Sequence, residues 1–197
     1  MRGYIAQLQA ISSDRPHVLA TAEAFAGYLD ALDGQATSGF ERIQRVIDDP
    51  GLSELAPGQR TMYYRALVAA HTERGDAEAG LAALERLAAL NSGVRLWEAE
   101  FHRLRASLLT QLAAPDGEIE AALDAALHAA RQQGARLIEL RALTDLLAHH
   151  RQRGNDPAAG QARAALAALL DASPERCDAT DFRAATVALI HRRAPLP

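Results

Sequence analysis

Few residues of this sequence are of types that could do chemistry, and their spacing argues against the sites they could form. His149 and His150 are the pair most typical of metal ligands. Neighbouring residues of a helix, however, point about 100° apart and do not share a face. No HExxH or comparable paired spacing occurs. We therefore predict that the chain holds no metal.

Three carboxylates, Asp116, Glu118 and Glu120, gather at the start of a predicted helix. The segment lacks the spacing of a calcium-binding loop. Acidic side chains in a first helical turn are stabilised by the helix dipole without any ligand. We expect these carboxylates to be structural.

The candidate nucleophiles have no partners that would activate them. Cys177 is the only cysteine, which excludes an intrachain disulfide and a cysteine-based zinc site, and no base is placed to activate it. The serines lack the context of a nucleophile elbow. A chain without lysine contains no phosphate-binding GxxxxGK[ST]. We predict that the protein is not an enzyme and needs no cofactor.

The composition favours helices. Apolar residues make up 49% of the chain and aromatic residues only 5%, and alanine and leucine dominate the apolar set. The net charge of -4 argues against a general nucleic-acid binder. The longest apolar run, at 164–170, is far below the ~20 residues that span a bilayer, and the N-terminus lacks a secretory signal pattern. We expect a soluble cytoplasmic protein that contacts no membrane.

Apolar periodicity predicts helices throughout and no sheet. Pro16, Pro50, Pro57, Pro115 and Pro157 fall at or near the predicted helix edges. The predicted helices cover 3–12, 17–32, 36–48, 60–74, 77–90, 96–112, 118–133, 136–152, 157–171 and 179–192.

A pattern of small residues repeats along the chain. Glycines at 34, 75, 117 and 154 are 41, 42 and 37 residues apart, and each is followed five positions later by Gly or Ala. A glycine between two helices turns the chain, and a small residue on the second helix lets the two backbones approach. We expect Gly39, Gly80 and Ala122 to be close-packing positions between helices.

The turn and the small residue together resemble the tetratricopeptide repeat. In the second repeat Tyr64, Leu67, Gly75, Gly80 and Leu84 match that signature, and in the first Gly27, Gly34, Gly39 and Ile43 do. The resemblance implies a single domain, 1–197, built as a right-handed α-solenoid of about four helix pairs with terminal helices. The repeats lie near 17–48, 60–90, 96–133 and 136–171, and a C-terminal helix covers 179–192.

A second resemblance covers roughly the last hundred residues. WEAEFHRLRASLL, AARQQGARLIELRAL and the helix after CDATDF are similar to the C-terminal repeats of bacterial cyclase/ATPase and LuxR-type transcriptional regulators. It implies a non-enzymatic protein–protein interaction domain of a bacterial signalling or transcriptional regulator. The chain is then either a free-standing short relative or a fragment of a larger regulator.

The helix around Trp97 carries many charges, but they border its apolar stripe. Trp97, Phe101, Leu104, Leu108 and Leu112 fall within about 80° of one another on a helical projection. Glu100, Arg103 and Ser107 lie on one flank, and Glu98, His102, Arg105 and Leu109 lie on the other. This arrangement argues against a buried catalytic cluster.

An Arg-Ala step recurs at Arg65, Arg105 and Arg141, on the first helix of three repeats. The resemblance implies that this position lines the concave groove, beside Met62, His102 and Ile138. Under one hypothesis these arginines form structural ion pairs with carboxylates of neighbouring helices. Under the other they bind an acidic or C-terminal segment of a protein partner, or a fused regulatory domain.

Two further functions stay open at this point. The domain could sense a small effector in its groove, or it could be a homodimeric scaffold. A closed apolar pocket of a few hundred Å³ would favour the effector, and an open groove would favour a peptide.

In the N-terminal helix, Tyr4, Ile5, Leu8 and Ile11 are too apolar to face water, so we expect the next helix or a second chain to cover them.

Overall fold

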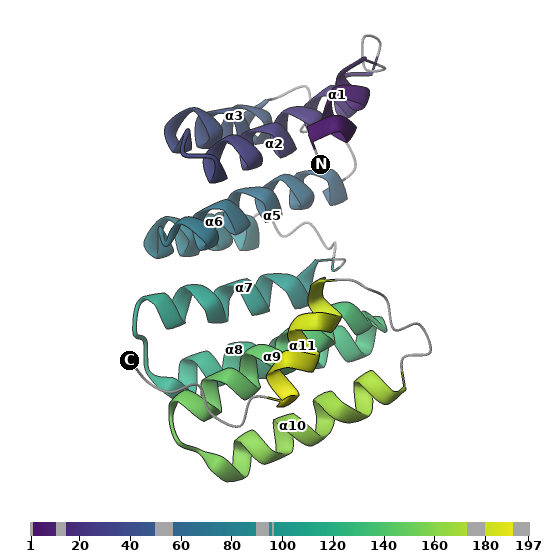
Figure 1. Ribbon diagram of the computed structural model, residues 1–197. Coiled ribbons are helices and arrows are strands. Elements are labelled where there is room, and N and C mark those ends of the chain that lie inside the picture. The colour runs from purple at the N-terminus through teal and green to yellow at the C-terminus, as the bar shows by residue number, and fades with distance from the viewer. Residues whose placement is uncertain are drawn as a thin grey trace. The chain divides into compact units, whose positions relative to one another are not determined.

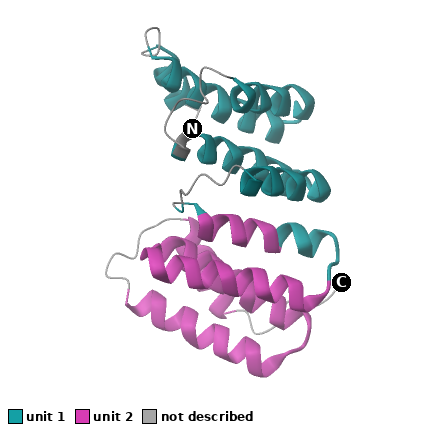
Figure 2. Ribbon diagram, turned by 180° about the vertical axis from the view of Figure 1, so that it is seen from behind, with its two compact units in different colours: residues 1–97, 107–114 teal, residues 98–106, 115–197 magenta. Residues whose placement is uncertain are grey.

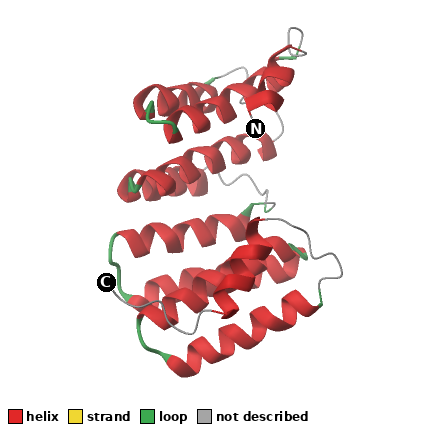
Figure 3. Cartoon of the chain, in the orientation of Figure 1, coloured by secondary structure: helices red, strands yellow, loops and turns green. Residues whose placement is uncertain are grey.

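The computed structural model describes residues 2–10, 15–49, 57–89, 95, 97–172 and 180–190. Within these ranges all regular secondary structure is helical and no strand occurs, which confirms the all-α class (Figure 3). The helices are α1 Arg2–Ala10, α2 Pro16–Leu32, α3 Ala36–Asp48, α5 Pro57–Arg74, α6 Ala77–Ala89, α7 Glu98–Gln111, α8 Asp116–Gln133, α9 Arg136–Gln152, α10 Asp156–Asp171 and α11 Thr180–Ile190 (Figure 1).

The chain divides into two compact units (Figure 2). Unit 1 comprises residues 1–97 and 107–114, and unit 2 comprises residues 98–106 and 115–197. The boundary therefore runs through α7, whose first part belongs to unit 2 and whose last part belongs to unit 1. The single domain expected over 1–197 stays a prediction.

Local sequence signals place the helix starts. Proline is the first residue of α2 and of α5, where its missing N–H costs no hydrogen bond. In α10 proline is the second residue, and the Asn155 side chain caps that helix by accepting a hydrogen bond from the Ala158 N–H at 3.3 Å. Asp116 and Glu118 lie in the first turn of α8, as the dipole favours.

Five helix-ending turns share one hydrogen-bond pattern. After α2, α5, α7, α8 and α9 a residue with positive φ is followed by an N–H that bonds the carbonyl five residues back, at 2.8 to 3.0 Å. This is the Schellman arrangement, which satisfies carbonyl groups left over at a helix end. The five residues with positive φ are Gly34, Gly75, Ala113, Gly134 and Gly154.

One predicted turn glycine was misplaced. Gly117 lies inside the first turn of α8, and the left-handed residue that ends α7 is Ala113, with φ of 51°. Glycine is preferred at a left-handed position but is not obligatory. The turn predicted at Gly117 from the glycine spacing is therefore wrong. The small residue that follows, Ala122, is buried at 2% exposure as expected.

Small residues bring helices into close contact in unit 1. A Cβ on Gly39 would lie 2.5 Å from the Gly27 carbonyl oxygen and 2.5 Å from the Ala31 nitrogen, so α2 and α3 meet backbone to backbone. A Cβ on Gly80 would lie 2.7 Å from Cδ2 of Leu108 and 3.3 Å from Cβ of His71. Both glycines are therefore close-packing positions, as predicted.

The N-terminal helix is only partly covered. Ile5 is 5% exposed and packs with Leu8 against Ala22 and Ala26 of α2. Tyr4, in contrast, is 64% exposed, so the next helix does not cover it, and its cover by a second chain stays a prediction. A tyrosine tolerates water because its hydroxyl group remains solvated. Ile11 lies outside the described residues.

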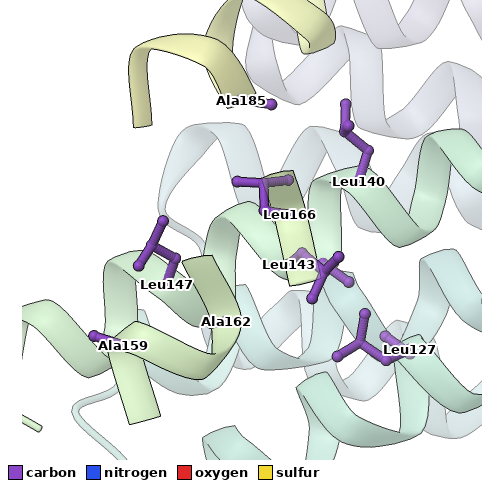
Figure 4. Packing of buried hydrophobic residues seen from close by; sticks show 10 residues of the cluster. Leu127, Leu140, Leu143, Leu147, Ala159, Ala162, Leu166 and Ala185 are labelled. Carbon is purple, nitrogen blue, oxygen red and sulfur yellow. The ribbon is translucent and has the colours of Figure 1, made fainter. Parts of the chain in front are cut away.

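Unit 2 has a core of leucine and alanine from four helices (Figure 4). Leu140, Leu143 and Leu147 line one face of α9, and Leu166 of α10 is fully buried against them. The alanines let α8, α10 and α11 approach closely, since they add little side-chain volume. The cluster comprises Ala126, Leu127, Leu140, Ala142, Leu143, Leu147, Ala159, Ala162, Leu166 and Ala185.

None of the described helices combines the length and the apolar character that crossing a bilayer requires.

Candidate functional site around Arg65 and the paired arginines

Arg65 projects from a strongly anchored stretch of α5 in unit 1. The surrounding residues Tyr63, Tyr64, Ala66, Leu67 and Val68 are all buried, at 6% exposure or less. The Arg65 side chain is half-buried. The buried neighbours hold the backbone of α5 from which the Arg65 side chain extends.

The guanidinium group of Arg65 lies over the indole of Trp97. Its central carbon is 4.6 Å from the centroid of the Trp97 ring, which is a cation–π contact. The Nε atom is buried and has no hydrogen-bond partner. No carboxylate of the described residues forms an ion pair with Arg65. The aromatic ring contacts the charged group, and Nε stays without a hydrogen-bond partner.

The phenol of Tyr28, on α2, shares this electrostatic environment. Burial raises the pKa of the Tyr28 hydroxyl, the Glu73 carboxylate raises it further, and the positive charge of Arg65 lowers it. Tyr28 is therefore a neutral hydroxyl group near neutral pH. Together with Trp97 it gives Arg65 an aromatic and polar setting. Met62, one helical turn before Arg65, is also half-buried.

Arg105 differs from Arg65 because it is exposed, on the first part of α7. No ion pair or hydrogen bond joins it to another described residue. Burial lowers the pKa of its neighbour His102, and the charge of Arg105 lowers it further while Glu98 opposes the shift. His102 is therefore an uncharged imidazole near neutral pH.

Arg141 is engaged in ion pairs within unit 2. Its Nε and Nη2 atoms donate to the two carboxylate oxygens of Asp181 at 3.0 and 2.8 Å, and its Nη1 lies 3.6 Å from Oε1 of Glu100. Such a two-point pairing of a guanidinium with a carboxylate favours an Arg at this site. The contacts of Arg141 are thus those expected if this arginine forms structural ion pairs with carboxylates of neighbouring helices.

Glu100 lies at the centre of this ion-pair network and is not among the site residues predicted from the sequence. Glu100 is 4% exposed, and it accepts hydrogen bonds from Nε and Nη2 of Arg103 at 2.9 and 3.1 Å. Arg103 also donates to Asp145 of α9 at 3.0 Å. Burial opposes the charge of Arg103, but Glu100 and Asp145 outweigh it and raise the pKa of Arg103.

The sequence spacing of Glu100 and Arg103 indicates part of this network. Glu100 and Arg103 are three residues apart, on the same flank of α7, as the helical projection placed them. Arg141 contacts this flank through Glu100, whereas His102 and Arg105 occupy the opposite flank. Arg65 belongs to the other unit, so the expected alignment of the three arginines on one face stays a prediction.

Ile138 has a packing role in the structure. It is partly buried against the cluster of Ala99, Ala129 and Ala130. Its side chain therefore helps to fix the start of α9 against α8, whatever else it contacts.

Unit 1 also contains an open depression, of about 530 Å³, between α3 and α5. Phe40 and His71, which line it, stack with ring centroids 4.1 Å apart, and the buried Leu67 also lines it. Burial lowers the pKa of His71, against the raising effect of Asp76, so this imidazole is neutral near neutral pH. An open, partly aromatic depression suits a peptide side chain better than an enclosed effector.

Among the described residues, one group could hold a metal ion. Glu120 of α8 and the neighbouring His149 and His150 of α9 place one ligand atom each within 4.8 Å of the others. Adjacent side chains leave a helix in different directions, but these two rings present different nitrogen atoms to Glu120, Nε2 of His149 and Nδ1 of His150.

In comparisons with protein-family models, curated proteins and solved structures, nothing matches this chain. The resemblance to tetratricopeptide repeats and to bacterial regulators therefore stays a prediction from the sequence.

Proposed function

We propose that this protein is a non-enzymatic helical-repeat domain that binds an acidic segment of a protein partner around Arg65 and Trp97. The observation that carries the proposal is the guanidinium group of Arg65, which is held over Trp97 with no carboxylate partner among the described residues. Arg103 and Arg141, in contrast, are already neutralised by Glu100, Asp145 and Asp181.

A carboxylate would complete the environment of Arg65. An arginine that an aromatic ring holds in place loses little conformational freedom when it binds, and its planar group can donate two parallel hydrogen bonds. Trp97 would give such a contact an apolar wall, in keeping with the enrichment of tryptophan and arginine among binding hot spots. This favours partner binding over structural pairing at this arginine.

The wider architecture that we propose is a right-handed solenoid of tetratricopeptide-like helix pairs. Recurrent Schellman turns, with Gly39, Gly80 and Ala122 buried on the helices that follow three of them, support it. Such repeats present extended surfaces to proteins, and the role in a bacterial signalling or transcriptional regulator rests on the sequence resemblance.

The proposal can be tested through Trp97, the only tryptophan of the chain. A hexaglutamate peptide should change the Trp97 fluorescence on titration, and the apparent affinity should fall as salt rises. The Arg65→Gln variant should lose about tenfold or more in affinity, which corresponds to about 1.4 kcal/mol. Arg86→Gln removes the same charge from an exposed site of unit 1 and should leave binding unchanged.

Two outcomes would argue against the proposal. One is equal loss of binding in the Arg65→Gln and Arg86→Gln variants, since the peptide would then respond only to net charge. The other is no response to hexaglutamate at low salt, while circular dichroism shows a folded protein.

A further inference from the structure

The end of α9 and the start of α8 lie against each other in unit 2. Nε of Arg153 is 2.7 Å from Oδ1 of Asp116, which joins the two helix ends at the surface. One turn further into α8, Glu120 faces the last turn of α9. Its Oε1 atom lies 3.6 Å from Nε2 of His149 and 3.3 Å from Nδ1 of His150.

Both imidazole nitrogens that face Glu120 lack a hydrogen-bond partner. The side chains of His149 and His150 are only 5% and 10% exposed, and their Nε2 and Nδ1 atoms are buried. Neither contact with Glu120 has the geometry of a hydrogen bond. Buried polar atoms in folded proteins almost always have partners, so two unpaired nitrogens beside one carboxylate call for an explanation.

The spacing of the three atoms is that of ligands around one ion. Tetrahedral zinc has ligand bonds of about 2.0–2.2 Å, which places neighbouring ligand atoms about 3.3–3.5 Å apart. The two separations from Glu120 are 3.6 and 3.3 Å, close to this value. The two nitrogens lie within 4.8 Å of each other, so small ring rotations would complete the arrangement.

We propose that Glu120, His149 and His150 bind a divalent transition-metal ion of the zinc class. Two imidazole nitrogens and one carboxylate oxygen are donors that zinc prefers, whereas calcium and magnesium favour oxygen alone. Glu120 is 38% exposed, so a water molecule can reach a fourth position from the solvent side. The ion joins α8 to α9 and is a structural clamp within unit 2.

Adjacent histidines can share one ion here because they use different nitrogen atoms. His149 offers the distant Nε2 and His150 the near Nδ1, which compensates for the divergence of neighbouring side chains on a helix. The backbone at both residues is fixed, since the carbonyl of His149 accepts from the Arg153 N–H at 3.1 Å and that of His150 from the Asn155 N–H at 2.9 Å. The ligands therefore project from a rigid turn.

The test uses the full chain without a polyhistidine tag. Titration with cobalt chloride should give the visible absorption bands of four-coordinate cobalt, with one ion per chain, and zinc chloride should abolish them. Glu120→Gln, His149→Gln and His150→Gln should each weaken zinc binding by about tenfold or more, since even outer-shell changes cost this much. Glu120→Gln alters a partly exposed carboxylate, so circular dichroism should show an unchanged fold.

His128→Gln is the matched control. His128 is an exposed histidine of the same helix α8, bonded to Gln132 at 2.9 Å, and its loss should leave zinc binding unchanged. The proposal is overturned if the wild-type chain takes up neither ion. It is equally overturned if the folded Glu120→Gln and His150→Gln variants bind zinc as tightly as the wild type.

Discussion

Gly27 and Gly39 place helices α2 and α3 in direct backbone contact: a Cβ on Gly39 would lie 2.5 Å from the carbonyl oxygen of Gly27. No side chain separates the helices at this point, so the contact cannot relax by a change of rotamer. The two glycines therefore fix the distance between the helices of the first pair.

The Gly39→Ala variant should be destabilised by about 1–3 kcal/mol, because the added methyl group meets backbone atoms. Gly160→Ala is the matched control, since a Cβ there has no neighbour within 4 Å in an exposed position of α10. It should stabilise the protein by about 0.5–1 kcal/mol through helix propensity. Urea unfolding measures the change in stability of both variants. A change in the same direction in both would contradict the close contact.

Gly80→Leu should also destabilise the protein, by about 1–3 kcal/mol. The larger side chain would collide with the methyl groups of Leu108 and with Cβ of His71. Gly80→Ala should cost less, because the Leu108 methyl groups can move aside. An unchanged melting temperature for Gly80→Leu would refute the packing of this position.

Ala113→Gly should stabilise the protein by about 1 kcal/mol. Ala113 has φ of 51°, a left-handed conformation that costs a residue with a Cβ roughly 1–2 kcal/mol and costs glycine almost nothing. The reverse change, Gly154→Ala at φ of 68°, should destabilise by a similar amount. Thermal unfolding of both variants checks the prediction, and a destabilised Ala113→Gly variant would contradict it.

Glu100→Gln should destabilise the protein by about 3–5 kcal/mol, because it removes the buried carboxylate that Arg103 and Arg141 share. Arg131→Gln breaks an ion pair with Glu139 in which the arginine is 56% exposed. That change should cost under about 1 kcal/mol. Similar losses in the two variants would show that the Glu100 network has no special role in stability.

Acid should weaken the protein through Asp181. Hydrogen bonds from Arg141 lower the pKa of Asp181 below its ordinary value, against the opposing effect of burial. The carboxylate therefore contributes stability that is present above the unfolded-state pKa of about 4 and is lost as pH falls through the lowered folded-state pKa. Asp181→Asn should flatten the decline of the unfolding free energy in this acid range.

The comparison between wild type and Asp181→Asn is needed because another group acts in the opposite direction. Removal of water from around the carboxylate raises the pKa of Asp145, against the lowering effect of the Arg103 charge. Its contribution to stability therefore increases as pH falls through that raised pKa. An identical pH profile for wild type and Asp181→Asn would refute the role of the Arg141 pair.

The sequence by itself determined the helices. The predicted ranges 36–48 and 136–152 coincide with α3 and α9, and most others differ by one to three residues at an end. Apolar periodicity, prolines at first turns and glycines at left-handed positions act over a few neighbouring residues, so they are visible without the fold. The turn after α7 was placed wrongly, at Gly117, because its left-handed residue is Ala113 and not a glycine.

Only the tertiary structure decided which charged groups meet. Arg141 pairs with Asp181, 40 positions away, and not with the nearby Asp145, which Arg103 takes. Trp97 comes to lie over Arg65, and Glu120 comes to face His149 and His150. Such pairings depend on how each helix is rotated and shifted against its neighbour, which the summed packing of apolar side chains sets. A list of charged residues along the chain does not contain that information.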